Sequence, residues 1–208
     1  MGSVGRLLAD RFDYVGVEPD PVSYAAAAKR IGVRGCVLNC AVEDLPVEGL
    51  FDILCAFEVL EHLEDDRGAL SEWLRHLRPG GLVLVSVPSG PSRFGLQDEY
   101  VGHYRRYDRA SLAALLGDAE VRELELVSYG FPLANLLELS RNQIARRRPA
   151  SSSLRTRTEA SGRWLQPPDW AAVATQAITS PFRRLQRASG ATNLGTGLIA
   201  RGRFDPGG

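Results

Sequence analysis

The chain has few of the residues that build disulfide frameworks and metal centres. Its 208 residues include three cysteines, which are Cys36, Cys40 and Cys55. These are odd in number and lack the paired spacing of metal ligands, so we interpret them as small core residues in a reducing compartment. The three histidines are His62, His76 and His103. Because they are scattered, the sequence predicts no metal site.

Long apolar runs are also missing. No segment approaches the roughly 18 consecutive apolar residues of a membrane span. The chain does not open with the charged, apolar and small-residue pattern of a signal peptide. With 44% hydrophobic residues, a chain of this length can build one core with an extension. We therefore expect a soluble cytoplasmic protein.

Lysine occurs once, at Lys29, and the arginines are unevenly spread. Residues 1–140 carry 13 basic and 22 acidic groups, whereas residues 141–208 carry 12 basic and three acidic groups. The basic clusters are Arg146, Arg147 and Arg148, and Arg183, Arg184 and Arg187. Such clusters could attract phosphates or anionic lipid, which leaves peripheral membrane contact open. The alternative is that these arginines belong to a solvent-exposed, partly mobile segment with no binding role. Nucleic acid is not an expected partner.

A strand, a helix and a second strand are predicted between Phe51 and Val87. Phe51–Phe57 is an apolar run typical of a strand buried on both faces of a parallel sheet. Arg67–Leu77 has the three-and-four spacing of an amphipathic helix. Pro79–Gly81 should end that helix, after which Leu82–Val87 reads as another buried strand.

The end of the first of these strands is where ligands are expected. In open α/β sheets the ligand crevice lies beyond the carboxyl ends of the strands. Phe57, Glu58, Glu61 and His62 follow that end directly. We therefore expect this loop to take part in the chemistry.

An earlier segment has the same organisation. Tyr14–Val17 is a short apolar strand that ends in Glu18 and Pro19, and a helical run follows over Tyr24–Ile31. An acid at a strand's end is suited to accept hydrogen bonds from both hydroxyls of a ribose. Glu18 is that candidate, and the alternative is an ordinary solvated acid before a turn.

The central motifs resemble a known family. The string FDxxxxxxVLEHLED, followed by LRPGG and a strand ending in VP, is similar to the motifs of class I S-adenosylmethionine-dependent methyltransferases, including the ubiquinone-biosynthesis type. The resemblance implies a Rossmann-like α/β fold with a seven-stranded sheet and S-adenosylmethionine as cofactor. It also implies methyl transfer to an oxygen, nitrogen or carbon atom of an unidentified small-molecule or lipid-linked acceptor, with Glu18 and Pro19 on the cofactor's ribose side.

The loop Cys40–Pro46 follows a third predicted strand, Gly35–Asn39, and resembles the family's adenine-side loop. The backbone amides of Val42 and Glu43 could meet adenine nitrogens, while Phe57 and Glu58 would lie on the cofactor side of the later strand. Many relatives carry an acid where Ala41 stands. The Glu43 and Asp44 side chains could instead be solvent-facing loop acids.

The start of the chain departs from the family pattern. The resemblance calls for a first strand and a glycine-rich loop, and Met1 and Gly2 stand near the end of that loop, before a predicted helix over Ser3–Arg11. Gly2 is a cofactor-binding candidate. Without the first strand, unpaired backbone groups would cost on the order of 1 to 3 kcal/mol each. We therefore expect an N-terminally truncated sequence, which translation of the DNA upstream of Met1 would test.

Gly102–Tyr107 reads GHYRRY and precedes a predicted leucine-rich helix that begins near Asp108. In similar methyltransferases this loop tends to lie over the mouth of the active site. His103 could act as a general base or orient the acceptor. The alternative is a structural hydrogen bond that holds the loop. The same two interpretations apply to His62, in the loop after the Phe51–Phe57 strand.

Two late strands, Glu120–Tyr129 and Gly195–Arg203, are expected to form the family's antiparallel edge hairpin. About sixty residues separate them, which is too long for a plain loop. We therefore expect a helical, arginine-rich lid over residues 131–193, between a cofactor-binding core at residues 1–130 and a closing strand and tail at residues 194–208.

Two other functions stay open at this stage. A nicotinamide-dependent (NAD) oxidoreductase would use an acid such as Glu18 in the same way, although the LEHLED and LRPGG motifs disfavour it. A noncatalytic binding protein, or an inactive fragment of such an enzyme, would be compatible with the missing glycine-rich loop. Binding of S-adenosylmethionine against NAD would separate the first of these from a methyltransferase.

Overall fold

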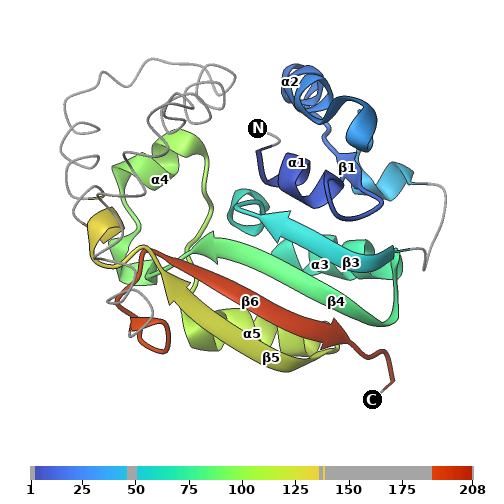
Figure 1. Ribbon diagram of the computed structural model, residues 1–208. Coiled ribbons are helices and arrows are strands. Elements are labelled where there is room, and N and C mark those ends of the chain that lie inside the picture. Colours follow the sequence, from blue (N-terminus) through green and yellow to red (C-terminus); the bar gives the residue numbers. More distant parts are fainter. Residues whose placement is uncertain (1–2, 46–50, 136–137, 139–188, 208) are drawn as a thin grey trace. The chain divides into compact units, whose positions relative to one another are not determined.

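The computed structural model describes residues 3–45, 51–135, 138 and 189–207 (Figure 1). The chain divides into two compact units, residues 1–48 and residues 49–208, and each is considered by itself. Within the described residues, strands form a two-stranded sheet in the first unit and a four-stranded sheet in the second.

The first unit is built from two short strand and helix pairs. Its elements are α1 (Ser3–Ala9), β1 (Val15–Val17), α2 (Pro21–Ile31) and β2 (Cys36–Leu38). The two strands are parallel, with Val15 opposite Cys36 and Val17 opposite Leu38. Helix α2 begins earlier than the predicted start at Tyr24, because Asp20 caps it by accepting a hydrogen bond from the Ser23 amide.

The second unit contains a mixed sheet with the strand order β3-β4-β6-β5. The strands are β3 (Phe51–Phe57), β4 (Leu77–Pro88), β5 (Val121–Tyr129) and β6 (Gly197–Phe204). Strands β3 and β4 are parallel, whereas β6 is antiparallel to both β4 and β5. The predicted antiparallel pairing of the two late strands is therefore confirmed.

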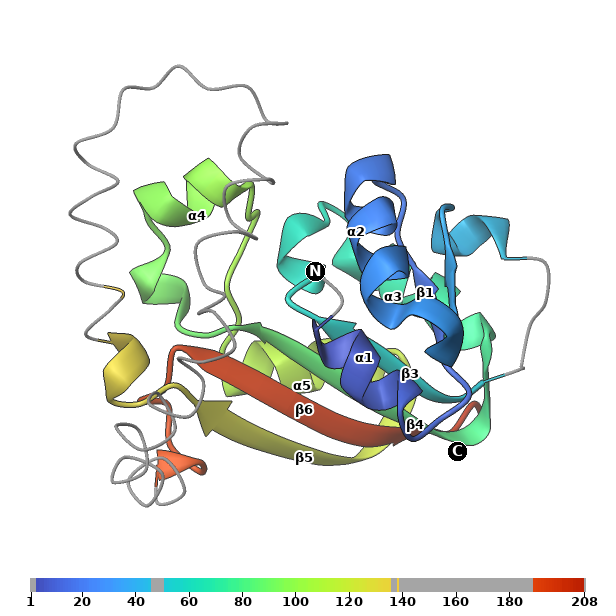
Figure 2. The same ribbon diagram turned by 45° about the horizontal axis from the view of Figure 1, so that its top comes forward.

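Helices α3 (Asp66–Arg75) and α5 (Arg109–Asp118) cover the same face of this sheet (Figure 2). They bury leucines against the alternate inward residues of β4 and β6, as amphipathic helices do. The buried core that these elements share includes Leu70, Leu74, Val83, Val85, Val87, Leu112, Leu115, Leu116, Leu198 and Ala200. This core fixes the ends of β3 and β4, from which the candidate site extends.

Three predictions about β3 and β4 are corrected. Helix α3 ends at Arg75, and Leu77 to Pro88 form β4, so Pro79–Gly81 do not end the helix. They lie in an irregular part of β4, where Phe51 pairs with Leu77 but Ile53 already pairs with Leu82. Strand β3 is not buried on both faces. Most of its side chains are half-buried, because it is the edge strand of this sheet.

The cysteines also differ from the prediction. Cys36 is exposed, and Cys40 and Cys55 are intermediate, so none of the three is a fully buried core residue. Cys36 begins β2, which consists of three residues and forms a sheet with β1 alone among the described residues. A short strand in a two-stranded sheet offers too little surrounding structure to bury every side chain.

Several predictions fall on residues that the structure does not describe. These are the cofactor contact of Gly2, most of the lid expected over residues 131–193, and both arginine clusters. Helix α4 (Leu96–Val101), which lies beyond the end of β4, was not predicted. None of the described helices combines the length and apolar character needed to cross a bilayer.

Candidate functional site

In the first unit, Glu18 stands directly after β1. Its amide donates a hydrogen bond to the Leu38 carbonyl, which extends the pairing of β1 with β2 by one residue. The Asn39 side chain donates to the carbonyl oxygens of Glu18 and Pro19, at 2.8 and 3.2 Å. Oxygen Oε1 of Glu18 accepts the Asp20 amide at 3.1 Å. The carboxylate is thus held at the strand end, where partial burial raises its pKa.

Val42 and Glu43 form a short 3₁₀ turn, Val42–Asp44, after β2. Asp44 closes this turn, because its side chain accepts the Ala41 amide at 3.2 Å. The first amides of a helical turn have no partner within the turn itself. The amides of Val42 and Glu43 are therefore suited to meet acceptor atoms of a ligand.

In the second unit, Glu58 follows β3 in a left-handed backbone conformation, with φ at 55°. A non-glycine residue adopts this conformation only when its surroundings hold it there. Oxygen Oε1 of Glu58 accepts hydrogen bonds from Ser86 Oγ at 2.9 Å and from the Tyr129 hydroxyl at 2.8 Å. Burial and the neighbouring Glu58 carboxylate raise the pKa of Tyr129, so this hydroxyl stays a donor. Glu58 is thereby tied to β4 and β5.

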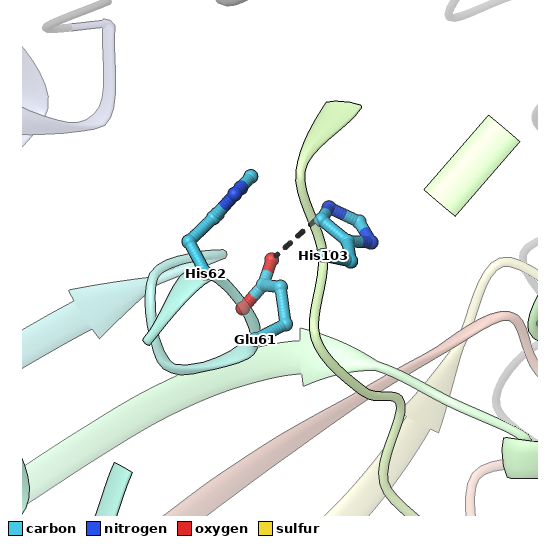
Figure 3. A group of neighbouring side chains, drawn as sticks. All are labelled: Glu61, His62 and His103. Atoms are coloured by element: carbon cyan, nitrogen blue, oxygen red, sulfur yellow. Dashed lines mark ion pairs between the residues drawn. The ribbon is translucent and has the colours of Figure 1, made fainter. Parts of the chain in front are cut away.

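Glu61, His62 and His103 come together beyond the end of β3 (Figure 3). Glu61 and His62 belong to a 3₁₀ turn, Leu60–His62, and His103 comes from the loop after α4. The two imidazole rings are edge to face, with centroids 4.6 Å apart. Nε2 of His103 lies 3.9 Å from Oε1 of Glu61. The backbone carbonyl of Glu61 accepts the Tyr104 amide at 2.7 Å, which joins the two loops.

Asp98 orients the ring of His103. Its Oδ1 lies 2.9 Å from Nδ1 of His103 and accepts a hydrogen bond from Nε of Arg106 at 2.8 Å. Burial opposes ionisation of Asp98, but the bonds from His103 and Arg106 outweigh it and lower its pKa to about 2. Arg106 also pairs with Glu138. Because an ionised Asp98 favours a proton on Nδ1, Nε2 of His103 is left to act as an acceptor.

Glu61 has an unusual environment for a carboxyl group. Its side chain is 0% exposed, and neither carboxyl oxygen has a hydrogen-bond partner among the described residues. Burial, together with the negative charges of Glu58 and Asp98, raises its pKa to about 8. For His62, desolvation and the positive charge of His103 lower the pKa. Burial and neighbouring charges therefore shift the protonation of Glu61 and His62.

The loop that carries His103 is anchored at its far end. The Tyr107 hydroxyl donates to Oδ2 of Asp66 at 2.7 Å, and Arg105 pairs with Oδ1 of the same carboxylate at 2.9 Å. The Tyr107 amide and carbonyl also bond to Pro88 and Gly90. The loop is therefore fixed both to the start of α3 and to the end of β4.

The predicted site residues thus fall into two groups. Glu18, Pro19, Val42 and Glu43 belong to the first unit, while Phe57, Glu58, His62 and His103 belong to the second. Of these, the structure brings His62 and His103 into contact. The roles of all eight residues stay predictions. The sequence placed Glu61 in the expected site loop but without a role of its own, and it carried no signal for Asp98, Arg106 or Tyr129.

Comparisons with known proteins point to one family. Residues 1–85 match the family model described as "Methyltransferase domain". A Mycolicibacterium gilvum protein named as an uncharacterized methyltransferase is 39% identical over 103 residues, which cover 46% of this chain and 40% of the relative. A probable S-adenosylmethionine-dependent methyltransferase of Mycolicibacterium smegmatis is 34% identical over 131 residues, which cover 59% of this chain and 49% of the relative. The chain thus spans about half the length of such relatives or less.

A third relative is a ubiquinone biosynthesis O-methyltransferase of Rickettsia conorii. It is 31% identical over 62 residues, which cover 30% of this chain and 22% of the relative. This match lies in the broad group that the motifs predicted. It concerns a short part of both proteins.

Solved structures share the fold. A possible histamine N-methyltransferase of Thermotoga maritima has a TM-score of 0.59 at 19% identity, and the match covers 97% of this chain and 78% of the Thermotoga chain. The N-methyltransferase NodS of Bradyrhizobium japonicum, in complex with S-adenosyl-L-homocysteine, has a TM-score of 0.57 at 16% identity, covering 99% and 73%. The [4+2]-cyclase SpnF has a TM-score of 0.55 at 20% identity, covering 99% and 72%. The predicted Rossmann-like methyltransferase fold is therefore confirmed, but a fold shared with a cyclase does not identify the reaction.

Proposed function

We propose that this chain, a class I S-adenosylmethionine-dependent methyltransferase by its domain and fold, transfers a methyl group to a nucleophilic atom of a small-molecule acceptor. The methyltransferase domain over residues 1–85 is the observation that carries the proposal. That domain includes Glu18 and the Val42–Asp44 turn as well as the start of the loop after β3. The named relatives support S-adenosylmethionine rather than a nicotinamide as the cofactor.

The residues of the first unit fit the cofactor's nucleoside. The Glu18 carboxylate, held at the end of β1 by Asn39 and Asp20, would accept hydrogen bonds from the ribose hydroxyls. Pro19 would fix the chain beside the ribose, and the amides of Val42 and Glu43 would meet adenine nitrogens. In the second unit, Phe57 and Glu58 are the proposed cofactor contacts. S-Adenosylmethionine supplies an activated methyl group on a positively charged sulfur, so the protein mainly positions the reactants.

His62 and His103 would serve the acceptor. Nε2 of His103 is free to accept a proton from an acceptor hydroxyl, because Asp98 holds the ring by its other nitrogen. His62, whose ring contacts that of His103, would help to orient the acceptor. The similarity to an O-methyltransferase of ubiquinone biosynthesis favours oxygen over nitrogen or carbon as the acceptor atom.

Transfer of a labelled methyl group tests the proposal. The purified chain is incubated with S-[methyl-³H]adenosylmethionine and a set of phenols, alcohols, amines and carbon acids, including lipid-linked members. We expect label in an acceptor together with S-adenosylhomocysteine in equal amount, and a loss of both in His103→Gln. The proposal would be contradicted if incubation gave neither a labelled acceptor nor S-adenosylhomocysteine. Hydride transfer to NAD by the same preparation would also contradict it.

A further inference from the structure

We propose that Glu61, His62 and His103 form a binding site for a divalent transition metal ion. One carboxylate and two imidazoles are a donor set that zinc, iron and related ions favour. The sequence predicted no metal site, since His62 and His103 lie far apart along the chain. The fold places them at the same point, beyond the end of β3 (Figure 3).

The geometry is close to that of a bound ion. Each residue offers one ligand atom, and these atoms all lie within 4.8 Å of one another. Ligands about 2.1 Å from a tetrahedral ion are about 3.4 Å apart. The contact between His103 Nε2 and Glu61 Oε1, at 3.9 Å, needs only a small side-chain movement to reach that spacing. His62 is exposed, which gives an ion a path from solvent.

Glu61 supplies an independent reason to expect a ligand. It is fully buried, and both of its carboxyl oxygens lack hydrogen-bond partners among the described residues. Burial of a charged carboxylate is costly unless it is paired or coordinates a metal. A cation between Glu61 and the two histidines would provide the missing partner.

The surroundings of the histidines match those of metal ligands. Metal-binding imidazoles commonly donate their second nitrogen to a carboxylate or a backbone carbonyl, which fixes the ring. Nδ1 of His103 lies 2.9 Å from Asp98 Oδ1, and the ring of His62 forms a hydrogen bond with the backbone of Gly102. Asp98 is therefore a positioning residue for the site.

The ion would also activate the methyl acceptor. This role of the ion rests on the proposed function, whereas the metal site itself does not. Three protein ligands leave a position of the ion open to water or substrate. An acceptor hydroxyl bound there would pass its proton to a solvent water molecule more readily, because the cation stabilises the resulting oxyanion. The ion would occupy Nε2 of His103, so it would replace that atom as the group that activates the acceptor.

Metal binding by the full chain tests the inference without any methyl donor. The protein is treated with a chelator, dialysed and titrated with ZnCl₂ by calorimetry, and with CoCl₂ by absorption spectroscopy. We expect one Zn²⁺ per chain and a Co²⁺ spectrum typical of nitrogen and oxygen ligands, with MgCl₂ in large excess failing to displace either ion. Failure to transfer methyl groups would leave these results unchanged, so the two proposals can be judged separately.

Variants identify the ligands. Glu61→Gln and His103→Gln should lose Zn²⁺ affinity by more than the roughly 10- to 100-fold that Asp98→Asn loses through its effect on His103. The matched control is Glu64→Gln in the same loop, whose exposed side chain should leave affinity unchanged. Circular dichroism checks that each variant folds. Zn²⁺ should raise the unfolding temperature of the wild type and of Glu64→Gln equally, that of Asp98→Asn by less, and those of Glu61→Gln and His103→Gln least.

Three results would overturn the inference. The first is no Zn²⁺ or Co²⁺ binding by the wild type, and the second is equal affinity in wild type and Glu61→Gln. The third is a Co²⁺ to thiolate charge-transfer band that persists in Glu61→Gln, because it would assign the ion to cysteine.

Discussion

The loop from Gly102 to Tyr107 shows how single residues hold the site in place. Asp98 and Arg106 fix its first part, and Tyr107 fixes its end through Asp66. Tyr107 is 3% exposed, and its pKa is raised by burial and by the hydrogen bond to Asp66. The position of His103 thus depends on buried polar contacts that flank it on both sides.

Replacement of Tyr107 by phenylalanine tests the far contact. The change removes the hydroxyl and leaves Oδ2 of the buried Asp66 without this donor, so the free energy of unfolding should fall by about 1 to 3 kcal/mol. Urea denaturation measures the loss. Tyr104→Phe is the control, because Tyr104 is 55% exposed and should change stability by less than about 0.5 kcal/mol. Equal stability of wild type and Tyr107→Phe would show that the bond contributes nothing.

At the scale of elements, α5 depends on Asp108, the residue that caps its N-terminus. The Asp108 side chain accepts the Ser111 amide at 2.7 Å, and the Ser111 hydroxyl accepts the Asp108 amide at 2.9 Å. Helix α5 contributes Leu112, Leu115 and Leu116 to the core behind the sheet. The cap therefore stabilises the element that covers β5 and β6.

Asp108→Ala should lower the free energy of unfolding by about 1 kcal/mol, and Asp108→Asn by less, because asparagine still caps. The hydrogen bonds of this cap lower the pKa of Asp108 below its ordinary value of 3.8. A depressed pKa means that the charge stabilises the fold at neutral pH and that this contribution is lost as the pH falls below that value. Denaturation of wild type and Asp108→Asn should therefore converge in acid. A difference that grows as the pH falls would contradict this assignment.

The elements were largely predictable, but their ends and contacts were less so. The strand Phe51–Phe57 and the helix after Asp108 follow from local periodicity and capping, and both were confirmed. The LRPGG segment was assigned to a helix end, although the pairing of Leu77 with Phe51 draws it into β4. Such pairing is a long-range interaction that local spacing does not reveal.

The candidate site shows the same limit. The position of His62 after β3 could be predicted, because strand ends are visible in the sequence. Its contact with His103 could not, since it requires the loop after α4 to return to the end of β3. That the buried Glu61 carboxyl group has no hydrogen-bond partner among the described residues was equally hidden, because burial of a single side chain depends on the packing of segments distant in the sequence.

At the scale of the whole molecule, the cofactor residues are divided between the two units. Glu18, Pro19, Val42 and Glu43 are the proposed contacts of the first unit, and Phe57 and Glu58 are those of the second. Binding of the methyl donor is the property that tests both sets of residues.

Equilibrium binding of S-[methyl-³H]adenosylmethionine, in wild type, Glu18→Gln and the control Asp13→Asn, tests the central claim most directly. Hydrogen bonds to a charged group contribute about 1.5 to 3 kcal/mol, so Glu18→Gln should bind about 10- to 100-fold more weakly. Asp13→Asn, which alters an exposed acid of the same unit, should bind as the wild type does. Unlabelled S-adenosylhomocysteine should compete with the label and NAD should not. No binding by the wild type, displacement by NAD, or equal affinity in Glu18→Gln would contradict the account.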